Sequence, residues 1–249
     1  MSSTGPDDTR TRHKAAGTFP ETHWSLVLKA GVSDATESAR ALNTLCRSYW
    51  RPLYAFLRRQ GHTPHDAEDL VQGFLGRVVE RADLSSVRPE KGRFRTFLLV
   101  SLRNHVLQQV ERQKALKRGG GQTHLPIHID EAEALCAVDL SAVSPELAYD
   151  RQWFRTVLSR AMARLGQDYG ARGKAELFEN LAPFLDGADP GDYAVVGARL
   201  GMAEGTVAVT VHRLRLRLQE LIRSEILQTV ASPEQADEEM RHLMEIWMR

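Results

Sequence analysis

Residues 193–218 read YAVVGARLGMAEGTVAVTVHRLRLRL, and their apolar spacing predicts two helices joined by a tight turn. The first helix ends near Leu200, and the following Gly201 suits the left-handed residue of such a turn. Gly197 has no side chain, so the two helices can approach each other closely. The second helix carries one apolar stripe at three- and four-residue spacing, formed by Val207, Val211, Leu214 and Leu218. This pattern is typical of a helix-turn-helix.

A helix-turn-helix favours DNA binding, because its second helix lies in the major groove with its N-terminal residues at base edges. The residues at that end are Glu204, Gly205, Thr206 and Ala208. The opposite face carries side chains suited to phosphate contacts, namely His212, Arg213 and Arg217. An ordinary helical hairpin with a solvated basic face has the same pattern, so the motif alone leaves both interpretations open.

The rest of the chain also has helical periodicity and no convincing strand, so we predict an all-α fold. Three consecutive glycines at 119–121 break the helical pattern, and Ser-Pro-Glu at 144–146 and 232–234 are signals that begin new helices. We therefore expect two helical domains joined by a flexible linker, with a C-terminal helical tail. The expected ranges are a disordered N-terminal tail (1–20), a first domain (21–117), a linker (118–143), a second domain (144–229) and a C-terminal extension (230–249).

The C-terminal extension has an apolar face, formed by Met240, Leu243, Met244 and Trp247. This face either packs on the second domain or serves as a regulatory or partner surface. The sequence leaves both uses open.

The composition is that of a soluble globular protein, with 42% hydrophobic and 26% charged residues. No apolar run has the length of a membrane span, and the polar N-terminus has no secretory signal. We expect a cytoplasmic protein without membrane insertion. The sequence contains no GxSxG, P-loop or HExxH motif, so we predict that it is not an enzyme and that it has no cofactor and no metal.

Residues 88–118 carry nine Lys or Arg side chains against two Glu, a net charge of +7. Such a patch attracts phosphate even though the whole chain has a formal net charge of only +1. Asn104, Gln108 and Arg112 recur every four residues and share one helix face, beside Arg103. Asn and Gln can read base edges, while Arg and Lys hold phosphates. Two nearby phenylalanines either stack on unpaired bases or pack in the core, namely Phe94 and Phe97.

An acidic helix begins at Thr63-Pro64, which are an N-cap residue and a proline at the first helical position. The apolar residues of this helix predict a buried face, which leaves four polar side chains pointing outwards: Asp66, Glu68, Asp69 and Gln72. A metal site that combines these carboxylates with His62 and His65 is an alternative, as is one from His124, His128 and Cys136. The helix dipole already explains acids in a first turn, so neither metal site is required.

The order of these segments resembles the sigma-70 superfamily, and specifically its small extracytoplasmic-function members. Residues 46–56 (CRSYWRPLYAF) resemble the start of that family's region 2. Residues 65–72 (HDAEDLVQ) resemble the stretch that docks on the clamp coiled coil of the polymerase largest subunits. Residues 92–98 (GRFRTFL), followed by Arg103-Asn104, resemble the element that reads and melts the −10 region.

Residues 203–207 (AEGTV), with 212–215 (HRLR), resemble the region 4 helix-turn-helix that reads the −35 element. The likeness spans about residues 22–110 and 145–225, and it departs from the family at Gly73, Ala203, Ala208 and Thr210. Gly73 stands where the family usually has an acid, and Ala208 and Thr210 stand where it commonly has Lys and Arg.

The resemblance implies a sigma factor, which binds the RNA polymerase core and directs promoter recognition and transcription initiation. The residues implied in core binding are Asp66, Glu68, Asp69 and Gln72. Those implied at the −10 region are Arg93, Arg95, Phe97, Arg103, Asn104, Gln108 and Arg112. Those implied at the −35 region are Glu204, Gly205, Thr206, Ala208, His212, Arg213 and Arg217. Many family members are also held by an anti-sigma factor, which the sequence does not identify.

Two other functions compete with this interpretation. A stand-alone helix-turn-helix transcriptional regulator would dimerise and bind palindromic sites without joining the polymerase. A metal-dependent helical enzyme would use the histidine and carboxylate cluster. Neither accounts for the acidic and the basic helix together.

Overall fold

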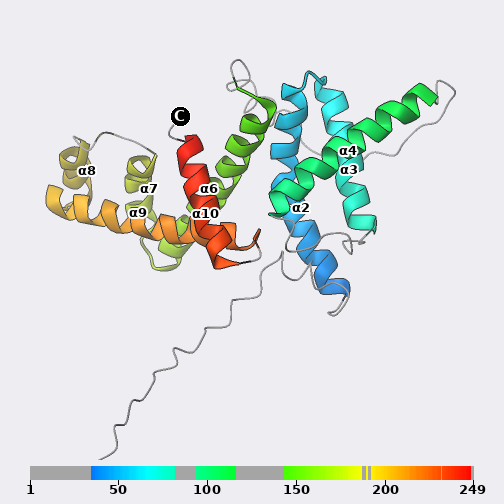
Figure 1. The fold of residues 1–249 in the computed structure, drawn as a ribbon. Coiled ribbons are helices and arrows are strands. Elements are labelled where there is room, and N and C mark those ends of the chain that lie inside the picture. Colours follow the sequence, from blue (N-terminus) through cyan, green and yellow to red (C-terminus); the bar gives the residue numbers. More distant parts are fainter. Residues whose placement is uncertain are drawn as a thin grey trace, which may run out of the picture.

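The computed structural model describes residues 35–81, 93–115, 143–186, 189, 192–230 and 232–247. Within them the chain is helical and has no strand, which confirms the all-α prediction. The helices are α2 (Ala35–Arg59), α3 (Pro64–Arg81), α4 (Phe94–Ala115), α6 (Pro145–Ala171), α7 (Ala175–Leu181), the 3-10 helix η3 (Ala182–Leu185), α8 (Tyr193–Leu200), α9 (Glu204–Leu227) and α10 (Pro233–Trp247). Figure 1 shows α2, α3 and α4 gathered at one end of the molecule and α7, α8 and the start of α9 at the other.

Helix α3 begins at its expected signal, and α2 continues through a proline. Thr63 caps α3, since its hydroxyl oxygen accepts a hydrogen bond from the backbone N–H of Asp66 at 3.2 Å. A proline inside a helix usually kinks or divides it, but α2 runs through Pro52 as one helix. The ring of Pro52 is buried, as are Leu53 and Phe56 beside it, both 0% exposed. Core packing therefore compensates for the hydrogen bond that proline cannot donate.

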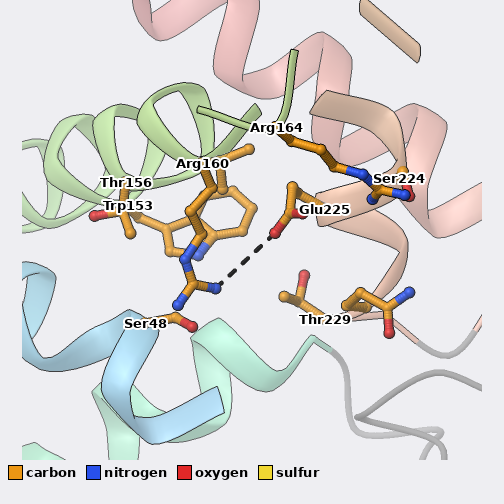
Figure 2. A pocket seen from close by; sticks show the side chains of 10 residues that line it. Ser48, Trp153, Thr156, Arg160, Arg164, Ser224, Glu225 and Thr229 are labelled. Atoms are coloured by element: carbon orange, nitrogen blue, oxygen red, sulfur yellow. Dashed lines mark ion pairs between the residues drawn. The ribbon is translucent and has the colours of Figure 1, made fainter. Parts of the chain in front are cut away.

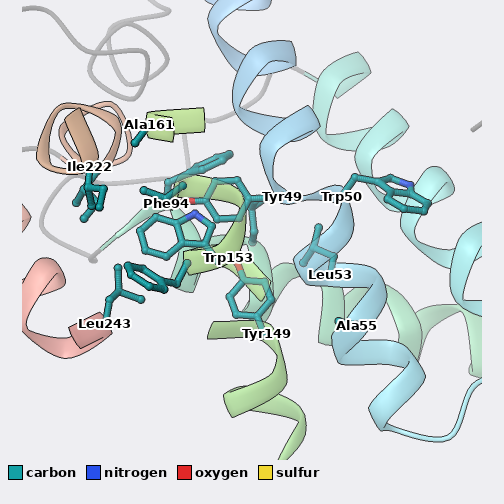
Figure 3. Close-up of a cluster of buried hydrophobic side chains, with 14 of the residues drawn as sticks. Tyr49, Trp50, Leu53, Ala55, Phe94, Tyr149, Trp153, Ala161, Ile222 and Leu243 are labelled. Carbon is teal, nitrogen blue, oxygen red and sulfur yellow. The ribbon is translucent and has the colours of Figure 1, made fainter. Parts of the chain in front are cut away.

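An aromatic seam joins the first three helices to α6. Tyr49 of α2 stacks on Trp153 of α6 with ring centroids 6.1 Å apart, and it meets the edge of Phe94 of α4 at 5.2 Å. All three rings are 1% exposed or less. Figure 3 shows them grouped where α2 and α6 face each other. The residues on either side of the predicted linker therefore pack on one shared core.

The predicted domain boundaries stay a prediction. The expected N-terminal tail and, except for Val143, the expected linker lie outside the described residues. The helix start predicted at residues 144–146 is confirmed, because the Ser144 hydroxyl accepts a hydrogen bond from the backbone N–H of Leu147 at 3.2 Å and α6 begins at Pro145.

The turn between α8 and α9 has the geometry that the sequence predicts. Gly201 lies in the left-handed region with φ 65°, at the C-cap of α8. A Cβ on Gly197 would lie 2.6 Å from the backbone oxygen of Met202, so a side chain there would collide with the turn. The predicted stripe of α9 is buried, with Val207, Val211 and Leu214 at 0% and Leu218 at 7% exposed. The axes of α8 and α9 are bent by 100° across this turn.

Helix α10 packs back on α6 and α9. Ala236 and Leu243 are fully buried, and Ile246 is 7% exposed. Met244, predicted on the same apolar face, remains 41% exposed. The extension therefore packs against the rest of the fold, which was the first of the two uses left open by the sequence.

Among the described helices, none by itself has the length and apolar character to cross a membrane. Only the bent pair of α8 and α9, taken together, passes on length and composition.

The close approach at Gly197 gives a stability prediction. We expect Gly197→Ala to lower the free energy of unfolding by about 2 kcal/mol, because the new methyl group meets a backbone atom that cannot rotate away. Gly205→Ala is the matched control, since a Cβ there has no neighbour within 4 Å. It should change stability by less than about 1 kcal/mol, in the stabilising direction. Chemical denaturation of the two variants measures the difference, and equal stabilities would contradict the packing described for this turn.

Candidate functional site

The start of α4 is the most highly charged place in the described core. Arg95 is 7% exposed and lies between Asp150 of α6 and Glu239 of α10. Its Nη1 donates to Asp150, and its Nη2 donates to Oε2 of Glu239 at 3.3 Å. Its Nε lies 2.5 Å from Oε1 of Glu239 without the alignment of a hydrogen bond. The guanidinium also lies over the Trp153 ring, 5.5 Å from the centroid.

The electrostatics of this site keep Arg95 charged. Burial by itself lowers the pKa of the guanidinium, but the charges of Glu239 and Asp150 outweigh it, so the pKa is raised above its ordinary value. The phenol of Tyr149 donates a hydrogen bond to the backbone oxygen of Arg95 at 3.0 Å. Burial raises the pKa of the Tyr149 phenol well above its ordinary value. The phenol therefore stays neutral beside the charged cluster.

Two further arginines of this end of the molecule are paired with acids. Arg93 places Nη1 2.5 Å from Oε2 of Glu239 and donates from Nη2 to Glu238 at 3.3 Å. Arg103 donates to Glu146 of α6 and lies over the Phe56 ring, 5.2 Å from the centroid. Three of the four arginines predicted to contact the −10 region, Arg93, Arg95 and Arg103, thus form ion pairs with residues of α6 or α10.

The outer face of α4 is open. Asn104 and Gln108 are exposed, as predicted from their spacing. Apolar side chains lie among them, with Leu107 62%, Val100 49% and Val110 40% exposed. The predicted Arg112 lies in α4, but its side chain is outside the described residues.

The two phenylalanines of α4 have different environments. Phe94 is fully buried and packs on Tyr49, so its role is in the core. Phe97 is half-buried, with its ring centroid 6.2 Å from that of Phe94. Of the pair, Phe97 alone retains exposed ring surface.

The acidic helix α3 presents most, but not all, of its predicted outward side chains. Asp66 and Asp69 are exposed, and the carboxylate of Asp69 lies 3.7 Å from Nδ1 of His65. Glu68 is only 8% exposed, so its expected outward position was wrong. It lies three and seven residues before Val71 and Leu75 and therefore shares their buried row. The half-buried Gln72 donates to the Glu68 carboxylate at 3.0 Å.

The helix-turn-helix presents a mixed surface. Glu204, Gly205 and Thr206 are exposed at the start of α9, whereas Ala208 is half-buried. His212, Arg213 and Arg217 are exposed further along the helix. Arg217 donates to Glu220 at 2.8 Å and to Asp168 of α6 at 3.3 Å. Sequence reasoning missed two exposed valines, Val195 at 62% and Val209 at 50%.

The two predicted DNA surfaces are not brought together. In Figure 1, α4 lies at one end of the molecule and α8 with the start of α9 at the other. A contact does join α4 to the far end of α9, because the backbone N–H of Phe94 donates to the carbonyl of Thr229 at 3.4 Å. The residues predicted for the −10 and −35 regions therefore belong to separate surfaces.

A cavity of about 300 Å³ lies where α2, α6 and the end of α9 meet. Its lining includes Ser48, Trp153, Arg164 and Ser224, and Arg160 lies 3.9 Å from Glu225 across it (Figure 2). The sequence did not predict this cavity, because its lining comes from three segments far apart in the chain.

Among the described residues, no group of three or more His, Cys, Asp or Glu side chains is arranged to hold a metal ion. The alternative metal site with His62, His65 and the carboxylates of α3 is therefore not found among these residues. The other alternative, with His124, His128 and Cys136, lies outside the described residues.

The described residues thus combine the arginine-bearing α4 with α8 and α9, two helices joined by a tight turn, on an all-helical frame. Residues 45–116 match the family model of sigma-70 region 2. The matched segment contains most of α2, all of α3 and α4, and less than a third of the chain. It supports the sigma-70 superfamily, whose members are non-enzymatic transcription initiation factors. Comparison with curated proteins and with solved structures gave no match.

A region 2 segment supports a sigma factor role, in which the chain binds RNA polymerase and takes part in promoter recognition.

Proposed function

We propose that the protein is a sigma factor of the extracytoplasmic-function type, which binds the RNA polymerase core and directs it to promoters. The observation that carries the proposal is the region 2 match over α2–α4, followed along the chain by a helix-turn-helix with a left-handed Gly201. A stand-alone regulator would need the second motif but not the first. The proposed function also requires a cytoplasmic location, because the polymerase and the promoter are there.

The exposed face of α3 is the proposed contact with the clamp of the polymerase. Asp66 and Asp69 are exposed on this face, and carboxylates of this kind complement a basic partner. Glu68 is buried beside them and accepts from Gln72, so we assign it to positioning the face. An anti-sigma factor that competes for the polymerase would act on this same face.

The outer face of α4 is the proposed contact with the −10 region. Asn104 and Gln108 offer amide groups that can hydrogen-bond base edges. Leu107, exposed between them, and the open side of Phe97 offer apolar surface on which unpaired bases can pack. These groups suit a strand whose bases have left the duplex.

The exposed start of α9 is the proposed contact with the −35 region. Thr206 lies at the end of the helix that would enter the major groove, and Arg213 lies two turns further on, where phosphates run. Two weak DNA contacts on one chain, held together by the polymerase, strengthen each other through effective concentration.

Reversal of one charge on α3 tests the polymerase contact. We expect the full-length protein to bind purified bacterial core RNA polymerase with submicromolar affinity, and Asp69→Arg to weaken binding by about tenfold or more, since a like charge then faces a basic surface. Glu245→Arg makes the same charge change at an exposed position of α10 and should bind like the wild type. Fluorescence anisotropy of labelled protein measures all three. A folded wild-type chain without affinity for the core would contradict the proposal and favour the stand-alone regulator.

Neutralisation of one cation on α9 tests the DNA contact of the helix-turn-helix. We expect Arg213→Gln to weaken binding to a mixed-sequence 30-base-pair duplex and to reduce the salt dependence of binding by about one unit of the log–log slope, as loss of one phosphate contact does. Arg172→Gln, at an exposed position after α6, is the matched control and should leave the slope unchanged. Equal slopes for the two variants would argue against this face of α9.

A further inference from the structure

Four carboxylates from distant parts of the chain converge on the basic end of α4. Glu146 and Asp150 come from α6, and Glu238 and Glu239 come from α10. Their partners are Arg93, Arg95 and Arg103, three of the four arginines that the family resemblance implies at the −10 region. We call this arrangement the acidic cover.

The acidic cover occupies the donors that DNA would need. A guanidinium binds carboxylate and phosphate through the same forked N–H groups, so one arginine cannot satisfy both with the same donors. The side chain of Arg95 is 8% exposed and that of Glu239 is 1% exposed, which leaves no room for a phosphate between them. Phosphate contact with Arg95 therefore requires α10 to move.

The ion pairs of the acidic cover can be replaced by contacts between the arginines and phosphate at little cost in stability. A buried ion pair contributes little net stability, because the cost of removing both charges from water offsets most of their attraction. Two other charge contacts involve α10. Arg223 pairs with Asp237 at 2.8 Å, and both side chains are more than 40% exposed, so this pair adds little. Nε2 of His242 lies 3.6 Å from Asp150, a pair that is charged only when the histidine is protonated. Apolar contacts through Ala236, Leu243 and Ile246 hold the rest of the helix.

We propose that α10, together with the start of α6, is an in-chain inhibitor that covers the basic end of α4 and must be displaced before α4 binds promoter DNA fully. This inference rests on the proposed function, since it regulates the same surface. The carboxylates of the inhibitor bind Arg93, Arg95 and Arg103 in the place of DNA phosphates. Asn104 and Gln108 stay exposed beside it, so a first contact with DNA can form while the cover is still in place.

The inhibitor predicts that loss of one buried acid increases DNA affinity. We expect Glu239→Gln in the full-length protein to bind a fluorescent, mixed-sequence 20-nucleotide single strand more tightly than the wild type. Arg93 and Arg95 each lose one of two carboxylate partners and keep Glu238 and Asp150, so the log–log salt dependence should steepen by at most about 1.4. Glu245→Gln removes the same charge from an exposed position of the same helix and controls for net charge. Equal affinity and slope for the two variants would overturn the inference.

A second pair of variants keeps the test independent of the buried site. Circular dichroism and thermal melting check the fold of Glu239→Gln, whose two arginine partners lose a buried charge. Glu238 is 57% exposed and forms an ion pair with Arg93. Glu238→Lys therefore replaces this attraction by repulsion between two cations, at a position outside the buried core. It should bind the single strand more tightly than Glu245→Lys. If Glu239→Gln does not fold, equal binding by these two lysine variants overturns the inference.

The same preparations separate this inference from the proposed function. Binding of the wild-type chain to core polymerase is measured alongside, and its absence would overturn the proposed function. If the wild type binds the polymerase but each variant binds DNA as its control does, the inference about α10 is overturned and the proposed function stands. Tighter DNA binding by Glu239→Gln and Glu238→Lys than by their controls supports it.

Discussion

The guanidinium of Arg95 is the point on which the closed arrangement of this chain depends. It is buried among the rings of the aromatic seam, and a buried cation is tolerated only when carboxylates and hydrogen bonds replace the water that it has lost. Those carboxylates come from α6 and α10, so the buried guanidinium has its partners only while both of these helices are in place. The charge of one side chain thereby ties together segments that lie 55 and 144 residues away from it.

The surfaces left open by this arrangement are as informative as those it covers. The acidic face of α3 and the amides of α4 are exposed, while the arginines at the start of α4 are paired. On the proposed function, the chain can therefore meet the polymerase before it engages DNA through its full basic surface. The weak DNA binding expected of the free protein then has a physical cause in ion pairs that compete with phosphate.

The features that were predictable from sequence depend on neighbouring residues. Gly197 and Gly201 predicted the turn between α8 and α9, and Thr63 and Ser144 predicted two helix starts. These predictions succeeded because caps and turns depend on interactions within a few residues. The burial of Arg95 was not predictable, since a run of basic residues looks the same whether water or distant acids surround it. The outward position predicted for Glu68 was wrong for a related reason: the burial of this side chain, at the edge of the buried row of α3, is decided by the helices packed against it.

The most direct test of this account is a distance measurement across the acidic cover. Spin labels on Val100→Cys in α4 and Met244→Cys in α10, both at exposed positions, would be placed in a chain whose native cysteines are replaced (Cys46→Ala, Cys136→Ser). Pulsed electron resonance then compares the free protein with its complex with core polymerase and a melted promoter fragment. We predict one distance in the free protein and a longer one in the complex. An unchanged distance in a complex that holds the DNA would contradict the account, because α10 would then remain in place while α4 binds.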